Sequence, residues 1–141
     1  YSLARQALCA GLQRKYAKEL LAPTRIYAAE VLGLVEKFSV RGIAHMTGGA
    51  FYEKLTRILP EGTCAAIDRN SWPVPEIFKI IQEKGKIKDR EMFRTFNMGI
   101  GMSFVFRPKD IPAVKAYLRK KRIAFYEIGK IVNDPKRKIV I

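Results

Sequence analysis

The segment from His45 to Ala50 carries the residues of this sequence that are best suited to binding or catalysis. It follows an apolar run and places two glycines, Gly48 and Gly49, directly after Thr47. Glycines between a strand and a helix expose backbone amides, which bind phosphate or carboxylate groups. The segment therefore predicts an anion-binding turn made by Thr47, Gly48 and Gly49. The alternative is that the two glycines serve only a tight turn.

His45 is the only histidine in the chain. Imidazole changes its protonation near neutral pH, so histidine often serves as an acid, a base or a hydrogen-bond donor in catalysis. A single histidine at the end of a strand can equally be a hydrogen-bonded structural side chain. The residue pattern alone leaves both interpretations open.

A second glycine-bearing segment contains Asn97, Gly99 and Gly101 at the start of the most apolar run in the chain. Without side chains, these glycines let a ligand or another stretch of backbone approach the strand closely. We expect the segment to shape a binding cleft, with helix packing against the sheet as the alternative. Trp72, next to Pro73 in a rigid turn, is expected to be a packing anchor rather than a binding residue.

The sequence lacks a Walker loop, a nucleophile elbow, a metalloprotease helix motif and paired carboxylates on one helix face. Carboxylates are scarce near the glycine segments, so there are few candidate magnesium ligands and no metal site is predicted. Cys9 and Cys64 lie far apart, without the spacing of a metal or redox site. We expect two buried thiols in a reducing cytosol rather than a disulfide.

The chain is strongly basic, with 27 Lys and Arg against 13 Asp and Glu and a formal net charge of +14 at pH 7. Such a charge favours anionic partners, from phosphorylated metabolites to nucleic acids. The basic clusters at 119–122 and 136–138 are expected to be solvated, because the first ends a helical pattern and the second lies in a turn. They lack exposed aromatic partners, and Phe104 and Phe106 are expected in the core. A nucleic-acid-binding module is therefore the less favoured alternative. No apolar stretch approaches the roughly 18 residues that span a bilayer, so no membrane partner is expected.

Apolar periodicity, prolines and glycines divide the chain into alternating helices and strands with no repeat and no linker. The expected helices lie at 1–18, 31–38, 50–59, 76–84 and 110–118. The expected strands lie at 41–46, 64–68, 98–106, 125–132 and 138–141, the last two joined by a hairpin-like turn at 133–135. The strand at 98–106 is apolar enough to be buried on both faces. This mixed order predicts a single α+β domain over 1–141, with a mixed sheet sandwiched with helices.

Five segments, in this order, resemble the C-terminal half of the phosphoribosylformylglycinamidine cyclo-ligase family, also called aminoimidazole ribonucleotide synthetases. They are PTRIY at 23–27, GIAHMTGG at 42–49, LPEG at 59–62, SWPVP at 71–75 and MFRTFNMGIGM at 92–102. Related ATP-dependent enzymes, such as selenophosphate synthetase and thiamine-phosphate kinase, share the glycine turn more loosely. Another member of this superfamily is the alternative.

The resemblance implies a cytoplasmic, homodimeric enzyme of purine biosynthesis that closes an imidazole ring with ATP and Mg²⁺. The formyl amide oxygen of a phosphorylated intermediate is activated by phosphoryl transfer, and the amidine nitrogen then attacks the activated carbon. The resemblance implies that the family's N-terminal domain, which holds an Asp-Gly-Val-Gly-Thr-Lys motif and most of the nucleotide site, is not part of this sequence. We therefore expect this chain to be the C-terminal half, to hold no tightly bound cofactor and to be inactive alone.

The resemblance also assigns roles to the two glycine-bearing segments. It makes His45 the candidate catalytic residue and the turn of Thr47, Gly48 and Gly49 the substrate-side anion site. The remaining candidates for substrate binding are Asn97, Gly99 and Gly101. The sequence departs from the family at Ala50, where the family's turn usually has a third glycine.

Overall fold

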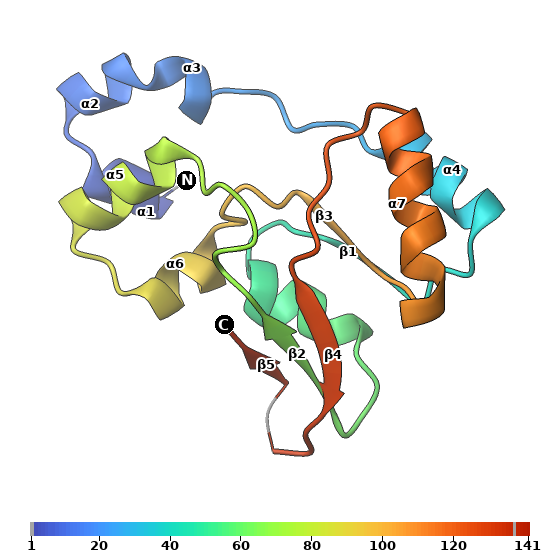
Figure 1. The fold of residues 1–141 in the computed structure, drawn as a ribbon. Helices are drawn as coiled ribbons and strands as arrows, with labels where there is room; N and C mark the ends of the chain where they lie inside the picture. Colours follow the sequence, from blue (N-terminus) through green and yellow to red (C-terminus); the bar gives the residue numbers. More distant parts are fainter. Residues whose placement is uncertain (1, 137) are drawn as a thin grey trace.

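The computed structural model describes residues 2–136 and 138–141 and has an α+β architecture, as predicted (Figure 1). The α-helices are α1 (Ser2–Ala7), α2 (Ala10–Lys15), α3 (Ala17–Leu20), α4 (Ala28–Lys37), α5 (Glu76–Gly85), α6 (Asp89–Thr95) and α7 (Ile111–Lys120). The strands are β1 (Gly42–His45), β2 (Thr63–Ile67), β3 (Met102–Val105), β4 (Gly129–Asn133) and β5 (Ile139–Val140). A π-helical turn η1 (Phe51–Leu55) and the 3₁₀ turns η2 (Thr56–Ile58) and η3 (Pro108–Asp110) complete the described elements.

The strands form two sheets. β1 pairs antiparallel with β3, so that Gly42 lies opposite Val105 and His45 lies opposite Met102. The second sheet is mixed, as expected, and has the order β4-β2-β5, in which β2 is antiparallel to β4 and parallel to β5. The predicted strands at 41–46 and 64–68 correspond to β1 and β2.

The predicted hairpin between 125–132 and 138–141 is wrong. β2 lies between β4 and β5 and pairs with both of them. Cys64 and Ala65 are completely buried small residues, so β2 has the character of a central strand and both of its edges need a partner. The carbonyl of Gly62 also accepts the amide of Asp134 (2.9 Å), which extends the pairing with β4 beyond the strand.

The strand predicted at 98–106 is shorter than expected, because its first residues form a turn. The Ile100 amide donates to the Asn97 carbonyl (2.9 Å), while Met98 and Gly99 have φ angles of 51° and 99°. Two successive positive φ angles reverse the chain and delay the strand until Met102. Its burial is also less complete than predicted, since Ser103 is buried but its neighbours in β3 are half-buried.

Helix α6 was not predicted from the sequence, although it buries Met92 and Phe93. Its first residue, Asp89, accepts hydrogen bonds from Gln82 of α5 and from Arg69. These hydrogen bonds lower the pKa of the Asp89 carboxyl below its ordinary value, and the bond from Gln82 is the larger cause. The short helix is thus fixed by residues outside it, and the spacing of apolar residues within the helix does not predict these contacts.

The helix expected at 1–18 is divided into α1, α2 and α3. Cys9 interrupts it with an extended backbone (φ −67°, ψ 162°) and is exposed, so the prediction that Cys9 is a buried thiol is wrong. Cys64 is buried as predicted, and both cysteines are free thiols.

The core consists of two clusters on either side of the β1–β3 ribbon. The larger contains Met46, Phe51, Trp72, Ile81 and Met92 and joins α1, α5 and α6 to the sheets. The smaller lies between α4 and α7 around Leu34, Val114 and Leu118, and Phe104 and Phe106 pack against it, half-buried, as part of the core. Within the described residues, no helix is both long enough and apolar enough to cross a bilayer.

Ala50 has a backbone conformation that favours glycine. Its φ is 27° and its ψ is −116°, and the residue is fully buried at the end of the glycine turn. L-residues in such regions cost about 1 to 3 kcal/mol. The third glycine expected at this position from the family would remove that cost.

We therefore expect Ala50→Gly to raise the free energy of unfolding by about 1 kcal/mol, after the loss of one buried methyl group is subtracted. Urea denaturation of the chain measures this. Ala65→Gly is the matched control, because Ala65 is equally buried but lies in ordinary strand backbone. It should lower the free energy of unfolding by about 1 to 2 kcal/mol. A loss of similar size in both variants would contradict strain at Ala50.

Candidate active site

The His45 side chain lies at the end of β1, on the exposed rim of an open groove. The groove has a volume of about 510 Å³ and is bounded by the chain before α4, the start of α4 and the ends of β1 and β3. Its lining residues are Arg25, Ile26, Tyr27, Ala28, Val31, Leu32, His45 and Met102. An apolar wall with two nitrogen-bearing side chains suits a ligand that combines a flat apolar part with an anionic group.

Arg25 and Tyr27 were not among the predicted site residues, although the segment that contains them carried the family resemblance. The Tyr27 ring contacts the His45 imidazole edge-on, with ring centroids 5.9 Å apart and planes at 66°. The Arg25 guanidinium lies 5.4 Å from the centroid of the Tyr27 ring and forms an ion pair with Glu30. The hydrogen bond from Arg25 is the main cause that lowers the pKa of the Glu30 carboxyl.

The turn after His45 keeps two backbone amides available. The Thr47 amide donates to the His45 carbonyl (3.0 Å) and the Ala50 amide donates to the Thr47 carbonyl (2.8 Å). Within residues 2–136 and 138–141, the amides of Gly48 and Gly49 have no hydrogen-bond acceptor. A side chain on Gly48 would point into open space, so a ligand can reach the backbone there.

The expectation that this turn opens an α-helix is wrong. Residues 51–55 form a π-helical turn and residues 56–58 a 3₁₀ turn, so the amides at this end lack the aligned dipole of a regular α-helix. The Glu53 side chain also lies against Gly49, where a methyl group would overlap its carboxylate. An anion at Gly49 would require the exposed Glu53 side chain to rotate away.

In the second glycine segment, Asn97 and Gly99 serve packing, whereas Gly101 lies beside the groove. The Asn97 Oδ1 accepts the Gly99 amide (3.0 Å), and a Cβ atom on Gly99 would lie 2.7 Å from Cδ of Pro75. These two residues therefore shape the turn that packs against the loop at 71–75. Gly101 instead lies under the Tyr27 hydroxyl, and its carbonyl accepts the Met46 amide (2.9 Å). Of the three residues, it is Gly101 that adjoins the His45 groove.

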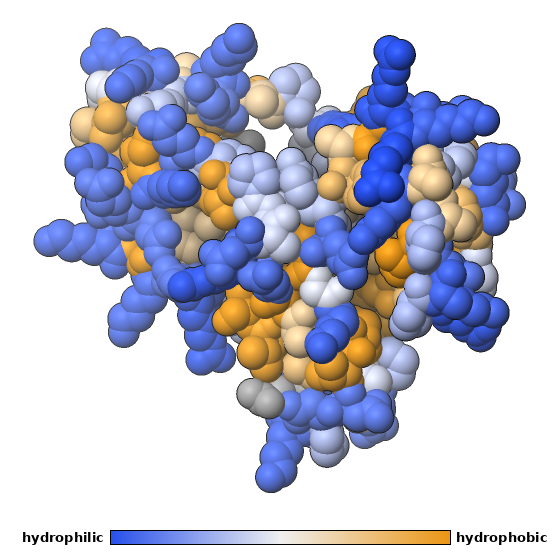
Figure 2. All heavy atoms as spheres, in the orientation of Figure 1, coloured by the Kyte–Doolittle hydropathy of each residue, from blue (hydrophilic) through white to orange (hydrophobic). Residues whose placement is uncertain are grey.

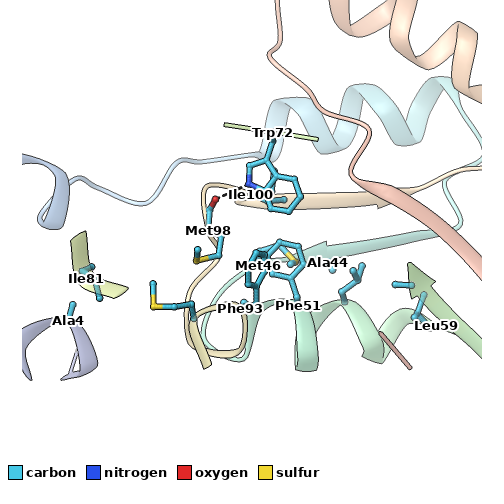
Figure 3. Packing of buried hydrophobic residues seen from close by; sticks show 14 of the residues in the cluster. Ala4, Ala44, Met46, Phe51, Leu59, Trp72, Ile81, Phe93, Met98 and Ile100 are labelled. Atoms are coloured by element: carbon cyan, nitrogen blue, oxygen red, sulfur yellow. Dashed lines mark hydrogen bonds between the residues drawn. The ribbon is translucent and has the colours of Figure 1, made fainter. Parts of the chain in front are cut away.

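An aromatic cluster holds the two segments together (Figure 3). Trp72 stacks on Phe51, which follows the glycine turn, with centroids 5.8 Å apart and planes at 15°. Phe93 of α6 contacts both rings edge-on, at 5.4 Å from Phe51 and 6.4 Å from Trp72. The indole Nε1 donates to the Met98 carbonyl (2.9 Å), drawn as a dashed line in Figure 3. Trp72 is the packing anchor that the sequence predicted.

A model of the family described as AIR synthase related protein, C-terminal domain, matches residues 1–141 of this chain. The chain belongs to this family. Because the match covers every segment described above, the His45 groove and both glycine-bearing segments lie within the family's C-terminal domain.

Three relatives named phosphoribosylformylglycinamidine cyclo-ligase are similar to the chain. That of Caldicellulosiruptor bescii is 47% identical over 81% of this chain, that of Geotalea daltonii is 46% identical over 87%, and that of Thermodesulfovibrio yellowstonii is 47% identical over 89%. The matched regions are 33%, 35% and 36% of these relatives. The chain therefore spans about one-third of the length of the curated relatives that it matches.

The described residues offer no metal site beside the groove. Among the described residues, no group of three or more His, Cys, Asp or Glu side chains is arranged to hold a metal ion.

Hydrophilic side chains surround the apolar areas of the surface (Figure 2). The basic cluster at 119–122 is exposed, but it does have an aromatic neighbour, since Arg119 lies 5.8 Å from the ring centroid of Phe125. Phe125 is half-buried and packs against the smaller core cluster, so it is not an exposed aromatic partner of the kind that nucleic-acid binding would need.

We expect Trp72→Phe to lower the free energy of unfolding by about 1 to 3 kcal/mol, because the buried Met98 carbonyl loses its hydrogen-bond donor. Urea denaturation followed by far-ultraviolet circular dichroism measures this. Tyr126→Phe is the control, since Tyr126 is 46% exposed and should change stability by no more than about 0.5 kcal/mol. Equal stability of the Trp72→Phe variant and the unaltered chain would show that the indole hydrogen bond does not anchor the turn.

Proposed function

We propose that this chain is the C-terminal part of an enzyme that closes the imidazole ring of formylglycinamidine ribonucleotide, with ATP, to give aminoimidazole ribonucleotide. The proposal is carried by the 43–47% identity to cyclo-ligases over most of the chain. We propose accordingly that the enzyme acts in de novo purine biosynthesis and in the cytoplasm. The substrate is phosphorylated, in agreement with the excess of basic side chains.

Within that reaction, His45 is the catalytic residue that this chain supplies. Its imidazole stands on an exposed rim, beside an apolar wall and next to a turn with free amides. From there it can donate a hydrogen bond to a polar group of the substrate in the groove and so hold the formyl amide in position. Catalysis of this kind depends on positioning and on charge stabilisation rather than on a covalent intermediate with the enzyme.

The turn of Thr47, Gly48 and Gly49 is proposed to bind an anionic group of the substrate. The free amides of the two glycines and the Thr47 hydroxyl are the donors available for it. The carboxylate of Glu53 competes for this position, so substrate binding includes the displacement of Glu53 from Gly49. Gly101 borders the same groove, whereas Asn97 and Gly99 contribute by fixing the turn that leads to it.

The described residues do not fit a complete ATP and Mg²⁺ site. Among the described residues no group of carboxylates is arranged to hold a metal ion: Glu30 is paired with Arg25, and Glu53 is folded over Gly49. Two carboxylates with separate partners do not form the oxygen cage that Mg²⁺ prefers. We therefore propose that the N-terminal domain of the full-length protein holds the nucleotide and the metal ion, and we assign no step to them here.

The N-terminal domain is also the proposed partner of the groove side of this chain. Several large apolar side chains before and within α4 are exposed, namely Leu21 (78%), Ile26 (84%), Leu32 (61%) and Val35 (50%). Apolar surface of this kind marks a contact with another protein surface. The full-length enzyme is proposed to be a homodimer, as the family resemblance implies.

The chain by itself should have no cyclo-ligase turnover, because it lacks the proposed nucleotide site. A steady-state assay with formylglycinamidine ribonucleotide, ATP and Mg²⁺ tests this, with the full-length protein as the positive control. Product formation by the chain alone above background would contradict the assignment of the nucleotide site to the other domain.

In the full-length enzyme, Gly48→Val should lower kcat/KM by about tenfold or more, because a branched side chain blocks access to the turn amides. The free energy of unfolding of the chain should stay within about 0.5 kcal/mol, since the added atoms point into open space. Gly11→Val is the matched control, because Gly11 also faces open space but lies in α2. Unchanged kcat and KM in the Gly48→Val enzyme would mean that the turn is structural only.

A further inference from the structure

We propose that Tyr27 is the positioning residue of His45, and that Gly101 is a glycine because the Tyr27 hydroxyl occupies the space of its side chain. The proposal concerns how the imidazole is held, and its consequence for the reaction rests on the proposed function of His45. It gives a role to Tyr27 and Gly101 that neither the motifs nor the comparisons assign.

The His45 imidazole needs an external constraint. Its side chain is exposed, and within residues 2–136 and 138–141 it forms no hydrogen bond and no ion pair. Among the described residues, the aromatic ring in contact with it is that of Tyr27, at 5.9 Å between centroids and 66° between planes. This edge-on geometry is a favourable arrangement for two aromatic rings, and it favours the rotamer that places the imidazole against Tyr27.

Tyr27, in contrast, is fixed on several sides. Its carbonyl accepts the Val31 amide (2.9 Å) at the start of α4, so its backbone is anchored to the helix. The Arg25 guanidinium lies 5.4 Å from the centroid of its ring, and Arg25 is itself paired with Glu30. The ring is half-buried, and its hydroxyl lies where a Cβ atom of Gly101 would be.

Gly101 is held in the same strand pair as His45. The Gly101 carbonyl accepts the amide of Met46, and the next residue of the strand, Met102, pairs with His45. Tyr27 therefore contacts the segment that pairs with His45, the residue that it orients. Even an alanine methyl at position 101 would overlap the Tyr27 hydroxyl, and the ring would have to leave its position against the imidazole.

The test uses the fact that His45 is the only histidine of the chain. In protein purified without a histidine tag, one imidazole Hε1 resonance reports on His45 alone. We expect nuclear Overhauser contacts between this proton and the Tyr27 ring in the unaltered chain. They should be lost in Gly101→Ala and retained in Tyr27→Phe, which keeps the ring.

Gly33→Ala is the matched control for the steric effect. A Cβ atom at Gly33 of α4 would lie 2.5 Å from the Tyr117 hydroxyl oxygen, so this variant creates the same kind of tyrosine clash away from His45. It should retain the His45–Tyr27 contacts. If the contacts are absent from the unaltered chain, or persist in Gly101→Ala, the proposal is wrong.

Kinetics of the full-length enzyme separate a positioning role from a structural one. Gly101→Ala and Tyr27→Leu should each lower kcat by about tenfold or more with a smaller change in KM, whereas Tyr27→Phe should keep more of kcat than Tyr27→Leu. If His45→Ala is inactive, but a variant that has lost the His45–Tyr27 contacts keeps an unchanged kcat, the positioning role is wrong. If His45→Ala is also unchanged, the proposed function has failed, and the positioning role that rests on it falls with it.

Discussion

The hydrogen bond from the Trp72 indole to the Met98 carbonyl is the constraint on which the site region depends. A buried indole N–H needs an acceptor, and Met98 offers its carbonyl by adopting a φ of 51°, which non-glycine residues rarely do. Met98 can hold this conformation because Gly99 follows it and packs tightly against Pro75. The loop at 71–75 and the turn at 97–100 thus determine each other's geometry, and Phe51, stacked on the Trp72 ring, links the glycine turn to the same unit.

From this unit the backbone passes directly into the site. The turn that ends at Ile100 is followed by Gly101, whose carbonyl binds Met46, so the Trp72 anchor sets where β1 ends and where His45 stands. Core clusters cover the ribbon, while its end at His45 and Met102 carries the groove with the exposed imidazole and the exposed wall at Ile26 and Leu32. An arrangement that fixes one histidine firmly but leaves its surroundings open agrees with a site completed by a second domain.

Local patterns were sufficient where neighbours in sequence decide the structure. α5 and α7 follow the apolar spacing of their own residues, and two prolines mark the turn at 70–75. Distant partners decided the rest: β2 separates β4 from β5, and Gln82 and Arg69 fix the start of α6. For the site, the residue types indicated His45 and the glycine turn. The contact between the Tyr27 hydroxyl and Gly101 joins residues 74 positions apart, and only the fold brings them together.

The most direct test of this account is the structure of the full-length enzyme with formylglycinamidine ribonucleotide bound. We predict that the ligand lies in the groove between Tyr27 and Leu32, with the His45 imidazole and at least one amide of the turn at 47–49 within hydrogen-bond distance. Glu53 should then have moved away from Gly49. A ligand bound elsewhere in the enzyme, without contact to His45 or to this turn, would contradict the account.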